Sequence, residues 1–398
     1  MYYKHLLNNT INLKIQIRNK LNLNKVYYWS PFLTPIATRK AVINSAYSLK
    51  KFSNNFECTI LNFFGEFNEN LKEIDKKGIS IENYYNFSFS KYLPKYGKIL
   101  SRISFMIFFL LGFFPLFNIL KRKNPDYLVI HLISSLPLII LILFNLKTKF
   151  ILRISGLPRL TFFRKLIWKI AFKKIYAVTC PTLSTFSYIK DLQIIEEKKL
   201  KILYDPIIEV RKIHLKQKEK LNINKEYYLS IGRLTTQKNF FFLCKCFKKL
   251  LLKKPNLNLL IAGDGEEYQK LNEYIKQNKI ENKINLIGYK SNIFPYLKNA
   301  KGFIMTSLWE DPGFVLVEAA FCRTLVLTSD SPGPKELIED NFNGVVFKSN
   351  DINSFENKFE ILTNLSNKNY LRLNNLKGVK KFTVFNHYKE FIKLLSTI

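Results

Sequence analysis

Residues 307–319 read SLWEDPGFVLVEA, and this stretch decides the fold. The apolar run 302–307 predicts a buried strand, the Pro-Gly pair predicts a turn, and the apolar spacing from Phe314 onward predicts the start of a helix. Glu310 then lies on the loop and Glu318 in the early turns of the helix. Backbone N–H groups between them, at the positive end of the helix dipole, suit an anion. Two carboxylates around an anion site fit a nucleotide sugar, which has hydroxyl groups at both ends and phosphate in the middle.

The rest of the C-terminal half alternates short apolar strands with helices. This pattern predicts a parallel sheet covered on both faces, with ligands at the carboxyl ends of its strands. The predicted strands are 227–232, 257–263, 284–288, 302–307, 325–330 and 344–347, and the predicted helices are 240–252, 266–278 and 314–322.

The N-terminal half shows the same alternation more loosely. Its predicted strands are 26–30, 59–63, 127–131, 150–154 and 175–180, and its predicted helices are 39–52, 134–144, 160–172 and 185–192. We therefore predict an α/β protein with two Rossmann-like domains whose parallel sheets face each other across a cleft. The predicted divisions are an extension 1–24, an N-terminal domain 25–206, a polar linker 207–226, a C-terminal domain 227–380, and a C-terminal helix 381–398 that can pack back on the first domain.

Composition limits the partners and the compartment. The 398 residues carry 63 Lys and Arg against 30 Asp and Glu, a formal net charge of +33. Such an excess is typical of proteins with an anionic partner, although the abundance of Lys, Asn, Ile and Phe throughout the chain also fits compositional drift. The five cysteines form no Cys-x-x-Cys pair, which favours a reduced cytosolic compartment. Residues 1–24 lack the apolar core of a signal peptide.

Two segments suggest contact with a membrane. Residues 103–120 contain no charge and are near the lower length limit for crossing a bilayer, but Gly112, Pro115 and Asn118 favour a buried or interfacial helix over insertion. Residues 160–176 contain aromatic side chains and many cations and no acid, which fits a helix lying on an anionic membrane. An ordinary amphipathic core helix is the alternative, and no motif supports nucleic acid as a partner. The aromatic residues are Phe162, Phe163, Trp168 and Phe172, and the lysines at helical spacing are Lys165, Lys169 and Lys173.

The strand 227–232 ends in the loop 232–239, which reads GRLTTQKN. Arg233 offers a planar fork of donors and Lys238 a point charge, and the spacing allows both to reach one diphosphate. By itself this pair also fits an ordinary solvated loop.

Four motifs in this order resemble the retaining GT-B glycosyltransferases of family 4, the glycosyl transferases of group 1. The segment EDPGFVLVEAA is most similar to lipopolysaccharide and capsule sugar transferases. The resemblance extends over residues 25–390, specifically in the C-terminal half and diffusely in the N-terminal half. The motifs are 232–239, 261–265 (IAGDG), 286–288 (LIG) and Glu310-x7-Glu318, and the segments 328–336 and 343–344 also fit.

The resemblance implies the GT-B fold, with 25–206 as the acceptor-binding domain and 227–380 as the nucleotide-sugar-binding domain, and it implies roles for single residues. Arg233 and Lys238 would hold the donor diphosphate and stabilise the charge that develops on it as the sugar leaves. Glu318 would accept the two ribose hydroxyls, and Glu310 would contact the transferred sugar. The backbone N–H groups that would bind sugar hydroxyls or phosphate are those of Gly313, Phe314 and Val315.

The loop residues Asp264 and Gly265 are further candidates for donor binding, with a simple turn as the alternative for Asp264. Enzymes of this kind hold the diphosphate with cations and helix ends, which implies no metal and no cofactor besides the donor substrate, UDP- or GDP-linked. The sequence agrees in having no Asp-x-Asp triplet.

On the acceptor side, His131 ends the strand 127–131, where relatives often place a histidine beside the sugar, for orientation or proton handling. Arg153 ends the next strand and could contact phosphate. The sequence departs from the family at Ser155-Gly156, where His-Gly is frequent. It departs again in the first loop, which lacks the usual Gly-Gly pair, so that a hydroxyl of Ser30, Thr34 or Thr38 would have to substitute.

These observations lead to one functional hypothesis and two rivals. The hypothesis is a cytosolic, peripherally membrane-associated transferase that moves a sugar from a nucleotide diphosphate to a lipid-linked glycan or lipopolysaccharide acceptor, with retention of anomeric configuration. One rival is a nucleotide-sugar epimerase or glycan phosphorylase on the same frame. The other is a catalytically inactive scaffold that binds membranes and partner transferases.

Overall fold

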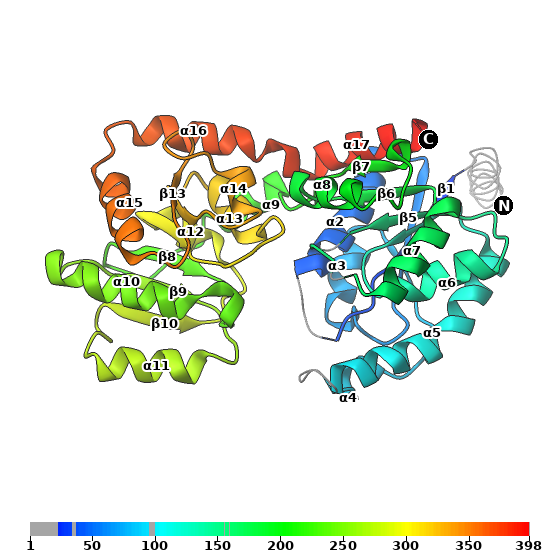
Figure 1. The fold of residues 1–398 in the computed structure, drawn as a ribbon, viewed down its shortest axis with the longest axis horizontal. Helices are drawn as coiled ribbons and strands as arrows, with labels where there is room; N and C mark the ends of the chain where they lie inside the picture. The colour runs from blue at the N-terminus through cyan, green and yellow to red at the C-terminus, as the bar shows by residue number, and fades with distance from the viewer. Residues whose placement is uncertain (1–22, 34–36, 95–99, 155, 159, 398) are drawn as a thin grey trace, which may run out of the picture.

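The computed structural model describes residues 23–33, 37–94, 100–154, 156–158 and 160–397. The described chain forms two α/β domains side by side (Figure 1), so the predicted fold class is confirmed. Of the predicted N-terminal extension, only the last two residues belong to the described part.

The N-terminal domain is built on a parallel sheet with the order β3-β2-β1-β4-β5-β6-β7 among the described residues. The sequence predicted five of these strands and missed β3 and β7, which have only three residues each. The strands are β1 Asn24–Trp29, β2 Phe56–Leu61, β3 Ser80–Glu82, β4 Tyr127–Ile130, β5 Lys149–Arg153, β6 Ala177–Cys180 and β7 Leu200–Ile202.

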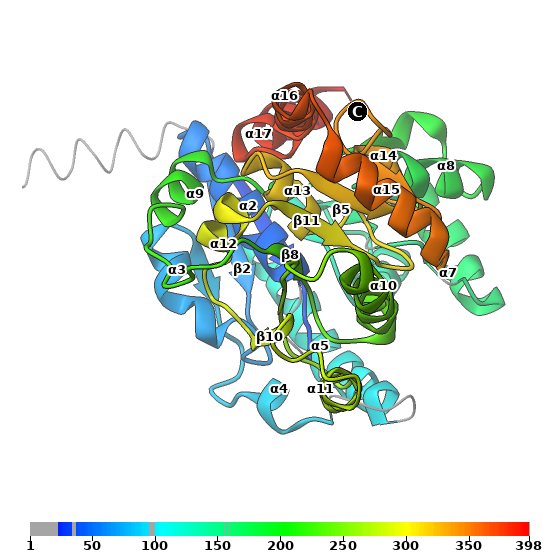
Figure 2. The same cartoon turned by 90° about the vertical axis from the view of Figure 1, so that its left-hand side faces the viewer.

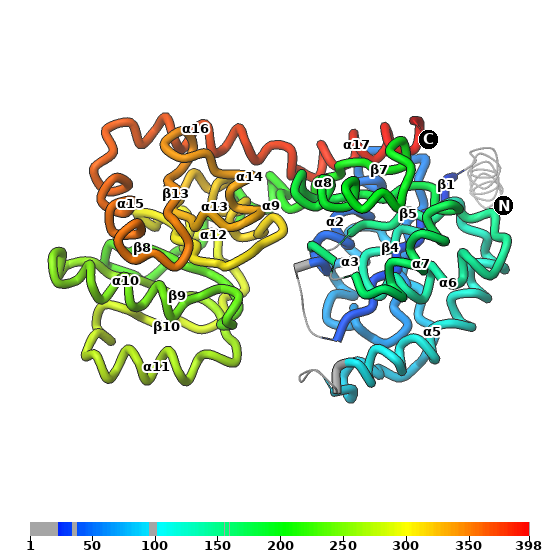
Figure 3. Tube along the Cα trace, viewed as in Figure 1, coloured from blue at the N-terminus to red at the C-terminus, as the bar shows by residue number. Residues whose placement is uncertain are grey.

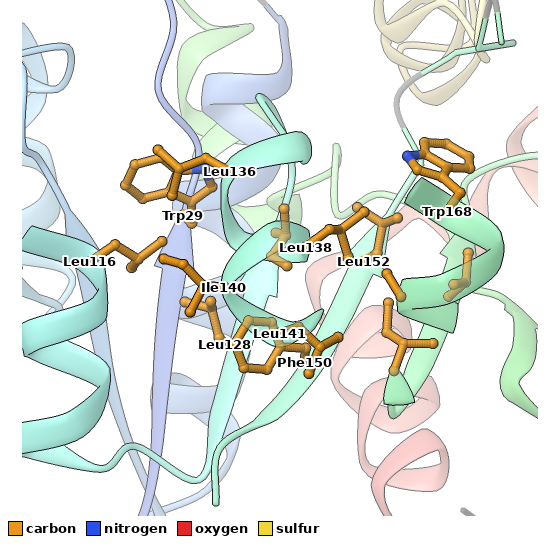
Figure 4. Close-up of a cluster of buried hydrophobic side chains, with 14 of the residues drawn as sticks. Trp29, Leu116, Leu128, Leu136, Leu138, Ile140, Leu141, Phe150, Leu152 and Trp168 are labelled. Atoms are coloured by element: carbon orange, nitrogen blue, oxygen red, sulfur yellow. The ribbon is translucent and has the colours of Figure 1, made fainter. Parts of the chain in front are cut away.

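Helices cover both faces of this sheet. The face toward α5, α6 and α7 holds an apolar core in which Trp29, Phe150 and Trp168 are almost fully buried (Figure 4). The opposite face packs against α2 and α3. The helices are α2 Ala37–Phe52, α3 Leu71–Lys76, α4 Phe89–Tyr92, α5 Leu100–Lys123, α6 Ser135–Leu143, α7 Phe162–Lys174 and α8 Leu183–Asp191.

The C-terminal domain repeats the plan with a parallel sheet of order β10-β9-β8-β11-β12-β13 in the described chain. Apolar cores again lie on both faces. The strands are β8 Tyr228–Ile231, β9 Leu259–Ala262, β10 Ile284–Gly288, β11 Gly302–Met305, β12 Val326–Ser329 and β13 Val345–Phe347. The helices are α10 Phe240–Lys253, α11 Tyr268–Gln277, α12 Phe294–Asn299, α13 Phe314–Phe321, α14 Pro334–Leu337, α15 Ile352–Asn364 and α16 Lys368–Gly378.

The chain passes twice between the domains, and the two passages lie side by side (Figure 3). The first contains the short helix α9, Val210–Lys216, within the stretch predicted as a linker. The second leads into α17, Val384–Ser396, which continues beyond α16 along the same edge of the molecule (Figure 2). Backbone hydrogen bonds from Ile207 and Ile208 to Phe382 join the passages. Helix α17 packs on α2, with Phe385 edge-to-face against Phe52.

Each sheet changes strand order between two neighbouring strands, and ligands of open α/β sheets bind at such points. In the C-terminal sheet the point lies between β8 and β11, whose following loops carry Lys238 and Glu310. In the N-terminal sheet it lies between β1 and β4, where the His131 N–H donates to the carbonyl of Trp29 at 2.9 Å. The topology therefore brings the donor-side and acceptor-side candidates to these two points.

Helix α5, which contains the uncharged segment 103–120, belongs to the N-terminal domain core on one side. Gly112 lies so close to Trp29, Phe64 and Leu136 that a Cβ there would be 3.1–3.3 Å from their side chains. Pro115 has no N–H for the carbonyl of Leu111, and the Tyr85 hydroxyl donates to that carbonyl instead, at 2.8 Å. Residues 102–123 are long and apolar enough to cross a bilayer, but 39% of the most apolar window is buried inside the protein. Insertion would break these packing contacts.

Burial of His387 makes the attachment of α17 sensitive to pH. Its Nδ1 donates to the carbonyl of Tyr204 at 2.8 Å, so its Nε2 accepts from the Ser45 hydroxyl at 2.9 Å. Burial lowers the pKa of His387 from 6.5 to about 4. As the pH falls, the unfolded chain therefore takes up this proton first, and the stability present above pH 6.5 is lost between pH 6.5 and 4.

We predict that His387→Asn flattens this pH dependence. Between pH 7.5 and 5.0 the wild type should lose about 2 kcal/mol of unfolding free energy through His387, and the variant should not lose that part. Urea unfolding at both pH values measures the difference. His214→Asn, on the exposed side of α9, should keep the wild-type slope. Equal slopes for His387→Asn and wild type would contradict the prediction.

Candidate functional site

Two loops of the C-terminal domain are joined by hydrogen bonds at its switch point. The first is the turn 235–239 after β8, and the second is the loop 306–313 after β11. The Leu308 N–H donates to the carbonyl of Gln237 at 2.9 Å, and Gln237 Nε2 donates to the carbonyl of Trp309 at 2.9 Å. The Thr306 hydroxyl donates to the carbonyl of Lys238 at 3.0 Å. These bonds fix the two loops that carry the predicted cation and carboxylate.

Lys238 and Glu310 form a close ion pair in this position. The side chains are only 15% and 8% exposed, so neither charge is well solvated by water. The stem of Lys238 crosses Gly232, where an added Cβ would be 3.3 Å from the lysine carbons. Gly313 has a φ of 90°, and a Cβ added to it would lie 3.3 Å from the Cβ and Cγ of Glu310. Both the dihedral angle and the close contact favour glycine at this position of the loop.

The loop 263–265 packs directly on the backbone of the loop after β8. A Cβ at Gly263 or Gly265 would overlap the carbonyl of Gly232 or Leu234. The Leu234 N–H donates to the carbonyl of Asp264 at 2.9 Å, and the Gly265 N–H donates to the Asp264 carboxylate at 2.8 Å. The glycines of this motif therefore allow close approach of two backbones, and the exposed Asp264 side chain stabilises a turn. Donor binding by Asp264 and Gly265 stays a prediction.

Glu318 lies in the second turn of α13 and is 6% exposed. Its partner is Lys40 of α2 in the other domain, with 2.5 Å between Lys40 Nζ and Glu318 Oε1. The carboxylate that would bind ribose is thus held by an ammonium group from the N-terminal domain. A nucleotide that uses Glu318 in the predicted way has to replace this contact or share it.

The remaining donor-side candidates surround the same place. Arg233 is exposed in the loop that follows β8. Gly313 precedes the first helical residue of α13, and Phe314 and Val315 form the start of its first turn, so their N–H groups lie at the positive end of the helix dipole. The structure thus assembles these residues around one point, while their contacts with a donor remain predictions.

On the acceptor side, His131 is 5% exposed at the end of β4. Burial, the nearby Arg153 and His387 hold the pKa of His131 well below its usual range. The imidazole is therefore neutral at physiological pH, which suits hydrogen bonding to a sugar hydroxyl better than ionic contact with phosphate. The predicted role in orientation or proton handling is compatible with this state but is not tested by it.

Arg153, at the end of β5, is buried and engaged with a carboxylate. Its Nε donates to Asp205 Oδ1 at 3.0 Å, and a second nitrogen of the guanidinium contacts Oδ2, which makes a bidentate pair. Side chains of both residues are 6% exposed or less. Because a buried pair loses much of its stability when one partner is withdrawn, the geometry favours a structural role. The predicted phosphate contact stays a prediction.

The structure describes some of the residues at the two departures from the family pattern. Thr34 and Ser155 lie outside the described residues. Ser30 is fully buried at the end of β1, and Thr38 lies in the first turn of α2. Gly156 has a φ of 73°, and a Cβ added to it would lie 3.9 Å from Asp311 Oδ2 of the other domain. Substitution of the missing glycine pair by a hydroxyl of Ser30, Thr34 or Thr38 stays a prediction.

The region predicted to lie on a membrane needs one correction. Trp168 and Phe172 of α7 are 2% and 1% exposed and belong to the core, so they cannot contact a bilayer. Phe162 and Phe163, in contrast, are 78% and 75% exposed. The periodicity of this helix placed its cations correctly on the exposed side but could not separate the aromatic residues of its two sides.

Two further charged residues with notable surroundings were not among the predicted site residues. Lys40 is one, because its partner is 278 positions away and no local pattern marks such a contact. Glu66, in the loop after β2, is the other. Burial raises the pKa of Glu66 to about 8, and its carboxyl accepts from the N–H of Phe64 at 2.8 Å. A Glu within the apolar run 63–67 was the available signal for a buried carboxyl.

Comparison with known proteins decides the family. Residues 212–375 match the family model described as glycosyl transferases group 1. An uncharacterized glycosyltransferase of Methanocaldococcus jannaschii is 30% identical over 314 residues, which are 73% of each chain. The chain belongs to the group 1 glycosyl transferases. The alignment with the archaeal relative is longer than the C-terminal domain, so the similarity to this family, glycosyltransferase family 4, includes part of the N-terminal domain.

Other relatives and solved structures agree with the assignment. A Campylobacter jejuni N-acetylgalactosaminyltransferase is 28% identical over 311 residues, 76% of this chain and 81% of its own. Among solved structures, HepE of Anabaena superposes with a TM-score of 0.69 at 16% identity, covering 94% of this chain and 100% of that one. TarM superposes with a TM-score of 0.71 at 13% identity, covering 93% and 98%. These structural matches show a shared GT-B fold.

Proposed function

We propose that this glycosyltransferase moves a hexose from a nucleoside diphosphate sugar to a glycan carried on a lipid diphosphate, with retention of anomeric configuration and without a metal. The observation that carries the proposal is the arrangement at the switch point of the C-terminal sheet. There, Lys238, Arg233 and the N-terminus of α13 supply positive charge beside two carboxylates. This combination fits a diphosphate with a sugar at each end.

The names of relatives support the acceptor class. The Campylobacter jejuni relatives include transferases that act on diphospho-undecaprenol glycans, one of them 31% identical over 161 residues. An Escherichia coli relative transfers galactose from UDP-galactose to a diphosphoundecaprenol-linked sugar and is 29% identical over 140 residues. Structures of HepE hold UDP and UDP-glucose. A UDP-linked donor is therefore our first choice, with GDP as the alternative.

The proposed reaction combines the charges at the site with the same-face course that the resemblance to the retaining transferases implies. The bond between the anomeric carbon and the diphosphate oxygen breaks, and the departing diphosphate gains negative charge. Arg233 and Lys238 stabilise that charge, which lowers the barrier. The acceptor hydroxyl attacks the same face of the sugar, and its proton passes to the departing phosphate oxygen. Glu310 holds the sugar hydroxyls, and His131, which is neutral, orients the sugar near the reacting bond.

We further propose that the enzyme binds the cytoplasmic face of the membrane through α5 and α7. Both helices cover the same face of the N-terminal sheet (Figure 1). Their outward sides expose large apolar residues together with cations, and this combination suits an anionic bilayer surface. The exposed apolar residues are Met106, Leu110 and Phe114 of α5 and Phe162, Phe163, Leu166 and Ile170 of α7, and the exposed lysines of α7 include Lys165, Lys169 and Lys173.

The first prediction from the proposed function tests the donor site. Saturating UDP, at about 100 times its dissociation constant, should stabilise the wild type by roughly 2.7 kcal/mol, and Glu318→Ala should remove most of this gain. Melting temperatures with UDP, GDP, ADP and CMP measure it. Glu281→Ala, on an exposed turn, is the matched control and should respond like the wild type.

Transfer is then measured as nucleotide release with a lipid diphosphate-linked acceptor and EDTA present. Release that needs the acceptor supports the transferase. Isomerisation of the donor, or release that needs inorganic phosphate, would favour an epimerase or phosphorylase. Absence of any nucleotide-dependent shift would favour a scaffold without activity.

The second prediction concerns Lys40. Because its ammonium group holds Glu318 in the ligand-free protein, Lys40→Met should tighten UDP binding about fivefold, equivalent to about 1 kcal/mol for a partly exposed ion pair. Titration calorimetry at low salt measures this, with Lys50→Met, exposed on the same helix, as the control. Weaker binding by Lys40→Met would contradict competition and would show that Lys40 itself holds the donor.

The third prediction concerns the membrane. Replacing both Phe162 and Phe163 by Ser should lower binding to vesicles containing phosphatidylglycerol by roughly tenfold or more, because two apolar side chains no longer enter the interface. Co-sedimentation measures the bound fraction. Leu252→Ser removes an 81% exposed apolar residue from the other domain and should leave binding unchanged. Equal binding of the double variant and the wild type would exclude α7 as the contact.

A further inference from the structure

The N-terminus of α8, in the acceptor-binding domain, is occupied by carboxylates of the donor-binding domain. Glu336 Oε1 accepts from the Leu183 N–H at 2.6 Å, and its Oε2 accepts from the Ser184 N–H and hydroxyl, both at 3.2 Å. The third N–H of the helix, that of Thr185, is bound by the side chain of Thr182 at 3.2 Å. The first three donors of α8 are therefore satisfied, two of them by the other domain.

A second carboxylate binds at the same place. Asp311 Oδ1 accepts from the Thr182 hydroxyl at 2.8 Å and lies 3.4 Å from that of Thr185. Burial raises the pKa of Asp311, and the nearby positive charge of Arg153 opposes this shift. A carboxylate at a helix N-terminus is stabilised by the unsatisfied N–H groups and by the helix dipole. A loop residue, Asp311, and a residue of the short helix α14, Glu336, thus dock on one helix of the other domain.

The segments that carry Asp311 and Glu336 contact the backbone of Glu310. Asp311 is its immediate neighbour, and the Glu310 N–H lies 3.3 Å from the carbonyl of Pro332 in the loop that leads to Glu336. Gly333 is packed so closely on the carbonyl of Glu310 that a Cβ there would overlap it. A shift of either docked carboxylate is therefore transmitted to Glu310 through rigid, short connections.

We propose that Asp311 and Glu336 are positioning residues, which dock on α8 and set the distance between the donor site around Glu310 and the acceptor-binding domain. Neither residue needs to touch the sugar. The dock holds the cleft at the separation at which an acceptor hydroxyl on one domain can reach the anomeric carbon on the other. A displacement of about 1 Å at that point is costly for a reaction between two bound substrates.

The test removes the contact from each side separately. Glu336→Ala removes the acceptor, and Leu183→Pro removes one N–H while keeping a residue that is well tolerated at the first helical position. The preceding Thr182 has φ −142° and ψ 157°, which a following proline allows. Glu339→Ala, exposed three residues further on, is the matched control.

Glu336→Ala should lower kcat for transfer about tenfold, with the dissociation constant of UDP within twofold of the wild type. Leu183→Pro should lower kcat by less, because the N–H and hydroxyl of Ser184 still contact Glu336 in that variant. The double variant should be no slower than Glu336→Ala alone, because that variant already lacks the contact with the Leu183 N–H. Small-angle X-ray scattering of the whole chain should show a larger radius of gyration for the variants and not for the control.

An unchanged transfer rate, losses that multiply in the double variant, or slower transfer at the wild-type radius of gyration would each overturn the proposal. The kinetic part rests on the proposed transferase function, whereas the scattering measurement needs no activity. A protein without transfer activity whose variants still open would therefore refute the function and leave the docking contact in place.

Discussion

The buried ion pair between Lys238 and Glu310 is the interaction on which the donor site depends. A buried charge without a partner is costly, so each residue needs the other as long as the site holds no ligand. In the proposed donor complex the diphosphate would become the partner of Lys238, and Glu310 would turn toward the sugar. Hydroxyl groups of the sugar would then replace the ammonium group as hydrogen-bond donors to the Glu310 carboxylate. The hydrogen bonds between the loops after β8 and β11 keep both side chains in place during this exchange.

The same logic extends across the cleft. Glu318 is paired with Lys40, Asp311 accepts hydrogen bonds from hydroxyl groups at α8, and Glu336 accepts from two N–H groups of the same helix. Carboxylates of the C-terminal domain therefore meet donors or cations of the N-terminal domain at more than one place. Only one of these contacts, that of Glu318, involves a residue with a predicted ligand role. Nucleotide binding can alter that contact while the α8 contacts continue to hold the domains together.

The sequence predicted the architecture well where local pattern decides it. Buried strands such as β11 and amphipathic helices such as α10 have strong periodicity, and both were located within two residues of their observed ends. The edge strands β3 and β7 have three residues each, too few for a pattern to emerge.

The glycine motifs could be recognised because close backbone packing leaves room only for glycine. Lys40 and the α8 contacts could not, because their partners lie more than a hundred positions away in the chain. Trp168 was assigned to the wrong side of its helix because α7 has aromatic residues on both its buried and its exposed side.

The two switch points differ in charge, and this difference bears on how the acceptor is bound. At the donor side, Arg233 is exposed and Lys238 can turn to a phosphate. At the acceptor side, the lowered pKa of His131 keeps its ring neutral, and Asp205 already offsets the charge of Arg153. The acceptor near the reacting bond is then best recognised through neutral hydroxyl groups, as a glycan offers. The phosphates of a lipid carrier would then bind elsewhere, and the exposed lysines of α7, on the outer surface of the same domain, would supply the positive charge that the neutral His131 and the paired Arg153 do not.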